Sequence, residues 1–146
     1  MTDKKRVWIA AGIILNPTGD KIFITRRAAN AHQDGFWEFA GGKVEANETA
    51  EHAVIRELQE EVGITATHIE PFIALEHDYP DKALTFDFFV IRQFSGEAFG
   101  KEGQPGKWVA ISELKDYPFP AANDVVLEKI VSELSVASSE IPNSAN

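Results

Sequence analysis

Four glutamates at fixed spacing are the residues of this sequence best suited to chemistry. They are Glu48, Glu57, Glu60 and Glu61, and a glycine stands at each end of the stretch. On a helix the last three occupy one arc of roughly 100°, where like charges repel and cost a few tenths of a kcal/mol per pair. Such a pattern indicates a bound cation. Oxygen ligands in a chain without cysteine favour Mg2+, with Mn2+ as a substitute. The plain alternative is a solvated acidic helix face.

The element that has to hold these carboxylates is predicted as a helix over residues 48–62. Asn47 is predicted as its N-cap, and Gly63 is predicted to close the other end in a left-handed conformation. A separate apolar stripe, expected to pack on the core, consists of Val54, Ile55, Leu58 and Val62. Arg56 flanks the carboxylate arc beside Glu60, where its guanidinium can hold a carboxylate through a forked pair of hydrogen bonds.

Two glutamates compete for the role of general base. A carboxylate beside a water whose pKa is lowered by a metal can take its proton, and Glu57 is our first choice. Glu102 is the rival, because it lies in a loop between Gly100 and Gly103 that can bring it to a metal or a water. A surface glutamate is the plain alternative for Glu102, and the sequence does not separate the two candidates.

Residues 42–64, written GKVEANETAEHAVIRELQEEVGI, match every specified position of the Nudix box and resemble the Nudix hydrolases. The resemblance implies a mixed β-sheet between α-helices, an α/β (α+β) fold. It also implies cleavage by water of the pyrophosphate in a nucleoside diphosphate linked to another group, with divalent metal on the box helix. The implied metal ligands are Glu57, Glu60, Glu61, Glu102 and the backbone carbonyl of Gly41.

Segments outside the box are similar to the bacterial branch of this family that removes oxidised guanine nucleotides. The similar segments are residues 22–29, the loop ending at His32, and residues 38–43, 100–106 and 119–123. This likeness implies hydrolysis of 8-oxo-dGTP, and of 8-oxo-GTP, to the monophosphate and pyrophosphate, which prevents mutagenic incorporation of oxidised guanine. It implies substrate contacts by Arg27 and His32. Ala40 departs from the pattern, which has proline before the double glycine.

The remaining substrate-binding candidates lie before the box and near the last helix. The wall on the nucleotide side is interpreted as Phe39 together with the backbone of Glu38, Phe39, Ala40 and Gly41. A core position is the alternative for Phe39. Asn123 is either an N-cap or a reader of the base. Its amide offers an acceptor beside a donor, which matches 8-oxoguanine, where N7 carries a hydrogen, better than guanine, which shows two acceptors.

The rest of the chain predicts strands, turns and a second helix in one domain. The predicted strands cover residues 7–15, 21–26, 36–39, 69–77, 84–92 and 107–111. Turns are expected at 16–20 and 80–81, a Gly/Pro-rich loop at 100–106 and a helix at 123–134. Trp8 and Trp108 are expected in the core. Residues 1–135 are interpreted as one domain and the Ser/Ala-rich residues 136–146 as a disordered tail.

Composition narrows the classes of partner. The net charge of −9 argues against duplex nucleic acid and against an anionic membrane surface, and no apolar run approaches the ~20 residues of a membrane helix. Cytoplasm is the expected location, and a monomer is expected. The expected partner is a nucleoside triphosphate, as the resemblance implies. Two alternatives remain: a Nudix hydrolase of other dNTPs or of ADP-ribose, and a non-catalytic nucleotide sensor on the same scaffold.

Overall fold

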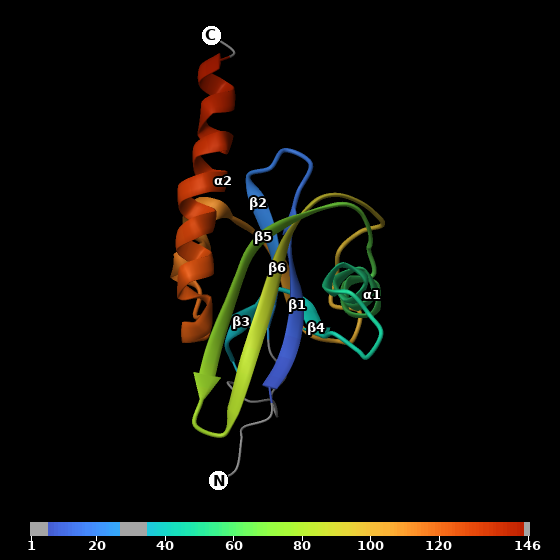
Figure 1. Ribbon diagram of the computed structural model, residues 1–146. Coiled ribbons are helices and arrows are strands. Elements are labelled where there is room, and N and C mark those ends of the chain that lie inside the picture. The colour runs from blue at the N-terminus through green and yellow to red at the C-terminus, as the bar shows by residue number, and fades with distance from the viewer. Residues whose placement is uncertain (1–5, 27–34, 145–146) are drawn as a thin grey trace.

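A mixed β-sheet lies between helix α1 (Ala50–Val62) on one face and helix α2 (Asp124–Ser144) on the other, as Figure 1 shows. The computed structural model describes residues 6–26 and 35–144, and side chains up to residue 134. Within these ranges one sheet contains seven strands. They are β1 (Arg6–Leu15), β2 (Lys21–Arg26), β3 (Trp37–Glu38), β4 (Gly41–Lys43), β5 (Thr65–Tyr79), β6 (Lys82–Ser95) and β7 (Gly106–Ala110).

The centre of the sheet is a parallel pair. The strands follow the order β3-β2-β1-β6-β5, and β4 and β7 add to β1 and β2. β1 runs parallel to β6 with Arg6 opposite Ala83 and Ile14 opposite Ile91, whereas the other pairings are antiparallel. The predicted mixed sheet between helices is confirmed.

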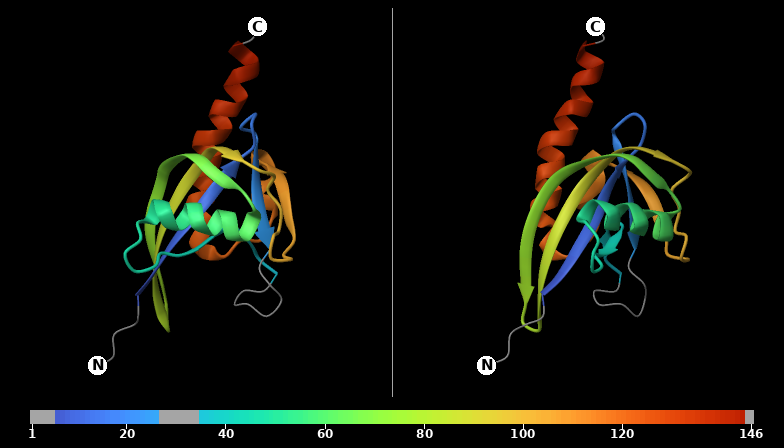
Figure 2. Two further views of the ribbon diagram at one scale, coloured as in Figure 1. Left: turned by 90° about the vertical axis from the view of Figure 1, so that its right-hand side faces the viewer. Right: turned by 45° about the vertical axis from the view of Figure 1, so that its right-hand side comes forward.

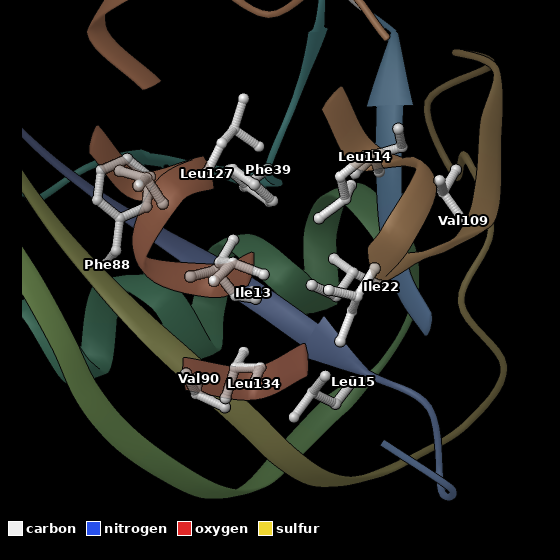
Figure 3. Packing of buried hydrophobic residues seen from close by; sticks show 14 of the residues in the cluster. Ile13, Leu15, Ile22, Phe39, Phe88, Val90, Val109, Leu114, Leu127 and Leu134 are labelled. Carbon is white, nitrogen blue, oxygen red and sulfur yellow. The ribbon is translucent and has the colours of Figure 1, made fainter. Parts of the chain in front are cut away.

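Alternation along β1 divides the core into two layers. Ala10 and Ile14 face α1, whereas Ala11, Ile13 and Leu15 face α2. Figure 3 shows the layer under α2, where Leu127 and Leu134 of the helix lie over side chains from several strands. On the other face, a methyl group at Gly12 would lie 3.0 Å from Leu58 Cδ1, so the glycine lets α1 pack closely on the strand.

Helix α1 begins two residues later than the sequence suggested. Thr49 is the N-cap, and its hydroxyl accepts a hydrogen bond from the His52 amide at 3.1 Å. The prediction of Asn47 as N-cap is therefore wrong, and Asn47 instead takes a left-handed turn conformation with φ of 67°. The prediction for Gly63 is confirmed, since it ends the helix with φ of 72°.

The C-terminal part differs most from the expected ranges. Two short 3-10 helices, η1 (Ile111–Asp116) and η2 (Ala121–Asn123), precede α2 and were not predicted. α2 continues to Ser144, and Figure 2 shows it extending past the end of the sheet. The division into a domain over 1–135 and a tail over 136–146 stays a prediction. Among the described residues, no helix has the length and apolar character needed to cross a membrane.

Candidate active site

A cleft of about 420 Å³ opens on the α2 face of the sheet. Its floor is made by alternate residues of the parallel pair β1 and β6, and its sides by the β3–β4 segment, the β5–β6 turn and η2. The floor residues are Val7, Ile9, Ala11, Leu84, Phe86 and Phe88. The sides include Glu38, Phe39, Gly41, Gly42, Lys43, Tyr79, Lys82, Ala122 and Asn123. An apolar floor with a few polar groups at the sides is the usual form of a small-molecule site.

Phe39 belongs to the cleft and to the core together. Its side chain is only 5% exposed, stacks on Phe119 with ring centroids 5.2 Å apart, and meets Phe88 edge-on at 6.1 Å. It also lines the cleft. The two interpretations offered by the sequence are therefore compatible, and this packing fixes the orientation of the ring that borders the cleft.

Asn123 also lines the cleft. It is the last residue of η2 and stands directly before the first residue of α2, and its backbone amide donates to Pro120 O at 2.9 Å. The side chain is half-buried. The cleft therefore contains the amide that the sequence analysis offered as a base reader, although its role stays a prediction.

The β3–β4 segment connects the cleft to α1. Phe39, Gly41 and Gly42 line the cleft, and Gly42 also lies against Glu57 of α1, whereas the Ala40 side chain packs under α1. Ala40 is only 1% exposed, packs in the apolar layer under α1, and its carbonyl accepts the Gly12 amide at 2.8 Å. The Ala40 side chain therefore belongs to the core, and the expected contact of the Glu38 to Gly41 backbone with the substrate stays a prediction.

Glu57 lies directly over Gly42 and is held by Arg56. The Glu57 side chain is 13% exposed, and its Oε2 accepts from Arg56 Nη1 at 3.0 Å. A methyl group at Gly42 would lie within 2.6 Å of both Glu57 oxygens, so this glycine makes room for the carboxylate. Glu57 is thereby fixed beside the segment that also borders the cleft.

The forked contact of Arg56 goes to Glu48, eight residues earlier, rather than to Glu60. Nε and Nη2 of Arg56 donate to the two Glu48 oxygens at 2.7 and 3.0 Å, and Nη2 also donates to Lys43 O at 3.0 Å. The hydrogen bond from Arg56 holds the pKa of Glu48 at about 2, and the same pair raises the pKa of Arg56. Arg56 therefore ties the start of α1, the end of β4 and Glu57 together.

Glu61 is a buried carboxyl group whose nearest charged neighbours are also carboxylates. Burial raises its pKa to about 9, with further contributions from a hydrogen bond with Glu57 and from the charges of Glu57 and Glu38. The Gly41 amide donates to Glu61 Oε1 at 3.4 Å, and this hydrogen bond lowers the pKa of Glu61. Buried carboxylates gathered in this way need a proton or a cation. Their oxygen donors suit a hard divalent ion, so the residues fit the metal that the box implies.

Glu60 and Glu102 lie further out. The Glu60 side chain is 55% exposed, with Arg56 Nη1 at 3.5 Å, and Glu102 is exposed on its loop. Among the described side chains, those of residues 6–26 and 35–134, no three acidic or histidine residues are grouped closely enough to hold a metal ion. The proposed ligand set of Glu57, Glu60, Glu61, Glu102 and the Gly41 carbonyl therefore stays a prediction. Arg27 and His32 fall outside the described residues.

The structure adds cleft residues that the sequence analysis did not select. Tyr79 and Lys82 flank the predicted 80–81 turn, and Leu84, Phe86 and Phe88 alternate along β6. The alternation was visible in the sequence, but the face on which it would lie was not. Only the parallel pairing of β6 with β1 places these side chains beside Val7 and Ile9.

A box helix over a double-glycine strand, on a mixed sheet between two helices, defines a nucleotide hydrolase scaffold, and the comparison with known families agrees. Residues 10–129 match the family model described as NUDIX domain. The chain belongs to the Nudix family, as the sequence analysis expected.

Individual relatives narrow the comparison. The chain is 50% identical over 126 residues to the 8-oxo-dGTP diphosphatase of Escherichia coli (strain K12), which covers 86% of this chain and 97% of the relative. It is 41% identical over 131 residues to the 8-oxo-dGTP diphosphatase of Haemophilus influenzae, covering 90% of this chain and 96% of the relative. A solved structure from work on MutT of Aliivibrio salmonicida and Vibrio cholerae has a TM-score of 0.79 at 46% identity, covering 88% of this chain and 99% of that one.

Replacement by alanine is expected to have different effects at the two glycines of β4, Gly41 and Gly42. In Gly42→Ala the methyl group displaces the Glu57 carboxylate, so we expect kcat to fall ~10-fold or more with little change in Tm. In Gly41→Ala the methyl group meets the backbone of β1, 2.6 Å from Ala11 Cα, so we expect a loss of about 1–3 kcal/mol in the free energy of unfolding. Thermal unfolding and steady-state kinetics on both variants check this. A Gly42→Ala protein with normal kcat would contradict it.

Proposed function

We propose that this protein is a Mg2+-dependent nucleoside triphosphate pyrophosphohydrolase that converts 8-oxo-dGTP, and 8-oxo-GTP, to the monophosphate and pyrophosphate. Removal of the oxidised nucleotide would prevent its mutagenic incorporation. The names of the relatives at 50% and 41% identity support this substrate, and the four box glutamates count against a non-catalytic sensor.

The main observation behind the proposal is that the β3–β4 segment borders the cleft and also contacts Glu57 of α1. Gly41 and Gly42 line the same cleft as Phe39, and Gly42 also lies against the Glu57 carboxylate. A nucleotide whose base occupies the cleft beside Phe39 and Asn123 would reach Glu57 with its phosphates on the side of Gly41 and Gly42. Base recognition and phosphate chemistry are then served by neighbouring residues of one strand segment.

Recognition of the oxidised base follows from the chemistry of an amide. Asn123 presents an acceptor and a donor side by side, and 8-oxoguanine presents the complementary pair because its N7 carries a hydrogen. Guanine offers two acceptors at the same edge. A buried amide oxygen left unpaired by guanine costs ~1–3 kcal/mol, and stronger discrimination requires further contacts of the same kind.

The hydrolytic step assigns separate tasks to the residues of the site. Bound Mg2+ supplies positive charge against the phosphates and lowers the pKa of water, and Glu57, Glu60, Glu61, Glu102 and the Gly41 carbonyl would hold it. Glu57 accepts a proton from the attacking water. The new bond forms from the water oxygen to the β-phosphorus, as the family resemblance implies, and the bond from that phosphorus to the α–β bridging oxygen breaks. Arg56, fixed by Glu48, keeps Glu57 in position.

A substrate panel with Mg2+ tests the proposal. We expect kcat/KM for 8-oxo-dGTP to exceed the values for dGTP, dCTP and ADP-ribose by at least ~10-fold, because a single well-placed polar contact contributes about that much. Equal values for 8-oxo-dGTP and dGTP would remove the role in excluding oxidised guanine. Preference for dCTP or ADP-ribose would favour the alternative Nudix activity.

Asn123→Ala tests the proposed base reader separately from catalysis. We expect kcat/KM for 8-oxo-dGTP to fall ~10-fold to 100-fold, since the paired donor and acceptor are both lost, while hydrolysis of dGTP changes much less. The ratio of the two substrates in one variant is its own control for folding. An equal loss for both nucleotides would show that Asn123 supports the structure as an N-cap and does not read the base.

Three expectations from the sequence remain proposals. We expect the protein to act as a monomer and in the cytoplasm, with no duplex nucleic acid among its partners. Sedimentation equilibrium at micromolar concentration checks the first. Competition of substrate hydrolysis by duplex DNA checks the last, and no inhibition is expected from a chain of net charge −9.

A further inference from the structure

The loop that carries Glu102 is docked on the C-terminal end of α1. A helix leaves its last carbonyls without partners inside the helix, and this loop supplies donors for them. The amides of Phe99 and Lys101 donate to Val62 O and Glu61 O at 3.1 and 2.9 Å. Lys101 Nζ donates to Gln59 O at 3.3 Å. The loop is therefore bound to the same helical turn that presents Glu60 and Glu61.

Gln104 connects the two glutamate-bearing segments through one side-chain amide. Its Nε2 donates to the Glu61 carbonyl at 3.1 Å, and its Oε1 accepts the backbone amide of Glu102 at 2.9 Å. The side chain is half-buried. Both ends of the amide are used, so Gln104 links the Glu102 backbone amide to the last turn of α1, beside the bond from the Lys101 amide to the same Glu61 carbonyl.

The other side of the loop is attached to the sheet. The Arg26 amide at the end of β2 donates to Pro105 O at 3.0 Å. Gly100 allows the loop to fold onto itself, because a methyl group at this position would overlap the Gln104 carbonyl. The loop thus spans from α1 to β2, and Gln104 lies between its two attachments.

We propose that Gln104 is a positioning residue for hydrolysis, which places Glu102 relative to Glu61 by bonding to both backbones. This inference rests on the proposed function and deepens it. The Glu102 carboxylate is exposed, so the position of its backbone limits where the carboxylate can act. Loss of the amide allows the Glu102 end of the loop to move while Lys101 still anchors the loop to α1.

Gln104→Leu is the main test, because leucine has a similar size and makes neither hydrogen bond. We expect kcat for 8-oxo-dGTP to fall ~10-fold to 100-fold, since small displacements of a catalytic group have effects of this size, with KM within ~3-fold. The cleft that determines substrate binding lies elsewhere in the fold. Gln93→Leu, at an exposed glutamine of β6, is the matched control and should keep the wild-type kcat. A normal kcat for Gln104→Leu would overturn the proposal.

A double-mutant cycle separates positioning from general support. If Gln104 acts through Glu102, then Gln104→Leu added to Glu102→Gln should lower kcat by less than ~2-fold, because the two changes remove the same contribution. A further ~10-fold loss in the Glu102→Gln background would show that Gln104 acts independently of Glu102. That result would overturn the proposal.

A second variant tests the proposal if Gln104→Leu does not fold. A measurement of hydrogen exchange tests it if the wild-type protein does not hydrolyse 8-oxo-dGTP. Gln104→Glu keeps the acceptor for the Glu102 amide but loses the donor to Glu61 O, and it should also lower kcat ~10-fold. Amide hydrogen exchange at Glu102 should be faster in either Gln104 variant and unchanged in Gln93→Leu, whatever the substrate. Unchanged exchange at Glu102 would contradict the proposed placement. An inactive wild-type protein would overturn only the proposed function.

Discussion

Replacing Glu57 by glutamine is expected to reduce kcat for 8-oxo-dGTP ~10³-fold or more and to leave the fold intact. The amide has nearly the shape of the carboxylate that lies over Gly42, but it cannot accept a proton from water or carry negative charge towards a metal. General-base catalysis alone contributes about 10²–10⁴-fold. Single-turnover kinetics together with thermal unfolding measure both parts of the prediction.

Glu51→Gln provides the matched control for this variant. Glu51 is exposed in the first turn of the same helix, and its substitution should leave kcat unchanged. A Glu57→Gln protein with a near-normal rate would exclude Glu57 as the general base and would leave Glu102 as the candidate. Activity retained in Glu61→Gln as well would exclude both carboxylates of α1 as groups needed for hydrolysis.

Glu61→Gln is expected to abolish turnover and, in the presence of a chelator, to stabilise the protein. Burial raises the pKa of Glu61 from 4.5 to about 9. Above pH 4.5 the unfolded chain loses this proton while the folded protein retains it, so the free energy of unfolding of the wild type declines as the pH rises towards 9. Glutamine does not titrate. The variant should therefore be more stable than the wild type at pH 8.

The pH dependence and the effect of Mg2+ distinguish this explanation from a general effect on packing. The stability difference should be small at pH 4.5 and should widen up to pH 9, as followed by denaturant unfolding in EDTA. Added Mg2+ should stabilise the wild type more than Glu61→Gln, because ligand binding to the folded state shifts the equilibrium. A difference that is constant over this pH range, or an equal response of both proteins to Mg2+, would disprove the electrostatic cause.

Local patterns in the sequence were sufficient for the elements that depend on local interactions. The apolar stripe of α1 was predicted correctly, with Val54, Leu58 and Val62 fully buried. The left-handed Gly63 and the turn between β5 and β6 also follow from residue type alone. Alternation likewise predicted the course of β2 over the residues that the structure assigns to it.

Features that depend on contacts between distant parts of the chain could not be predicted from local sequence patterns. β4 consists of Gly-Gly-Lys, which has little intrinsic strand preference, and it forms because Gly41 and Gly42 pair with Ala11 and Ala10. Trp8 was expected in the core but is 42% exposed, because it lies on a part of β1 where its indole bonds to Asp87 at 2.7 Å. Trp108 is partly buried, as its packing against Phe23 requires.

In the candidate site, too, the residues of the helix itself were predicted, whereas their contacts with other segments were not. Sequence reasoning selected Glu57, Glu61 and Arg56, but it gave Glu48 no role as the partner of Arg56. Glu48 lies before the first turn of α1, and its carboxylate also accepts the Glu45 amide at 2.9 Å, so the chain turns back over the helix. The electrostatic effect of Glu38 on Glu61 arises only when β3 and α1 meet in the folded molecule.

The connection between β3 and β4 consists of only two residues, Phe39 and Ala40, with a bend at Ala40. Both side chains are buried, and Ala40 O accepts the Gly12 amide at 2.8 Å, so the connection is tied to β1. One inserted residue here would shift Gly41 and Gly42 from their places opposite Ala11 and Ala10 and would move Gly42 away from Glu57. A change of length should therefore be tolerated less in this short connection than in an exposed surface loop.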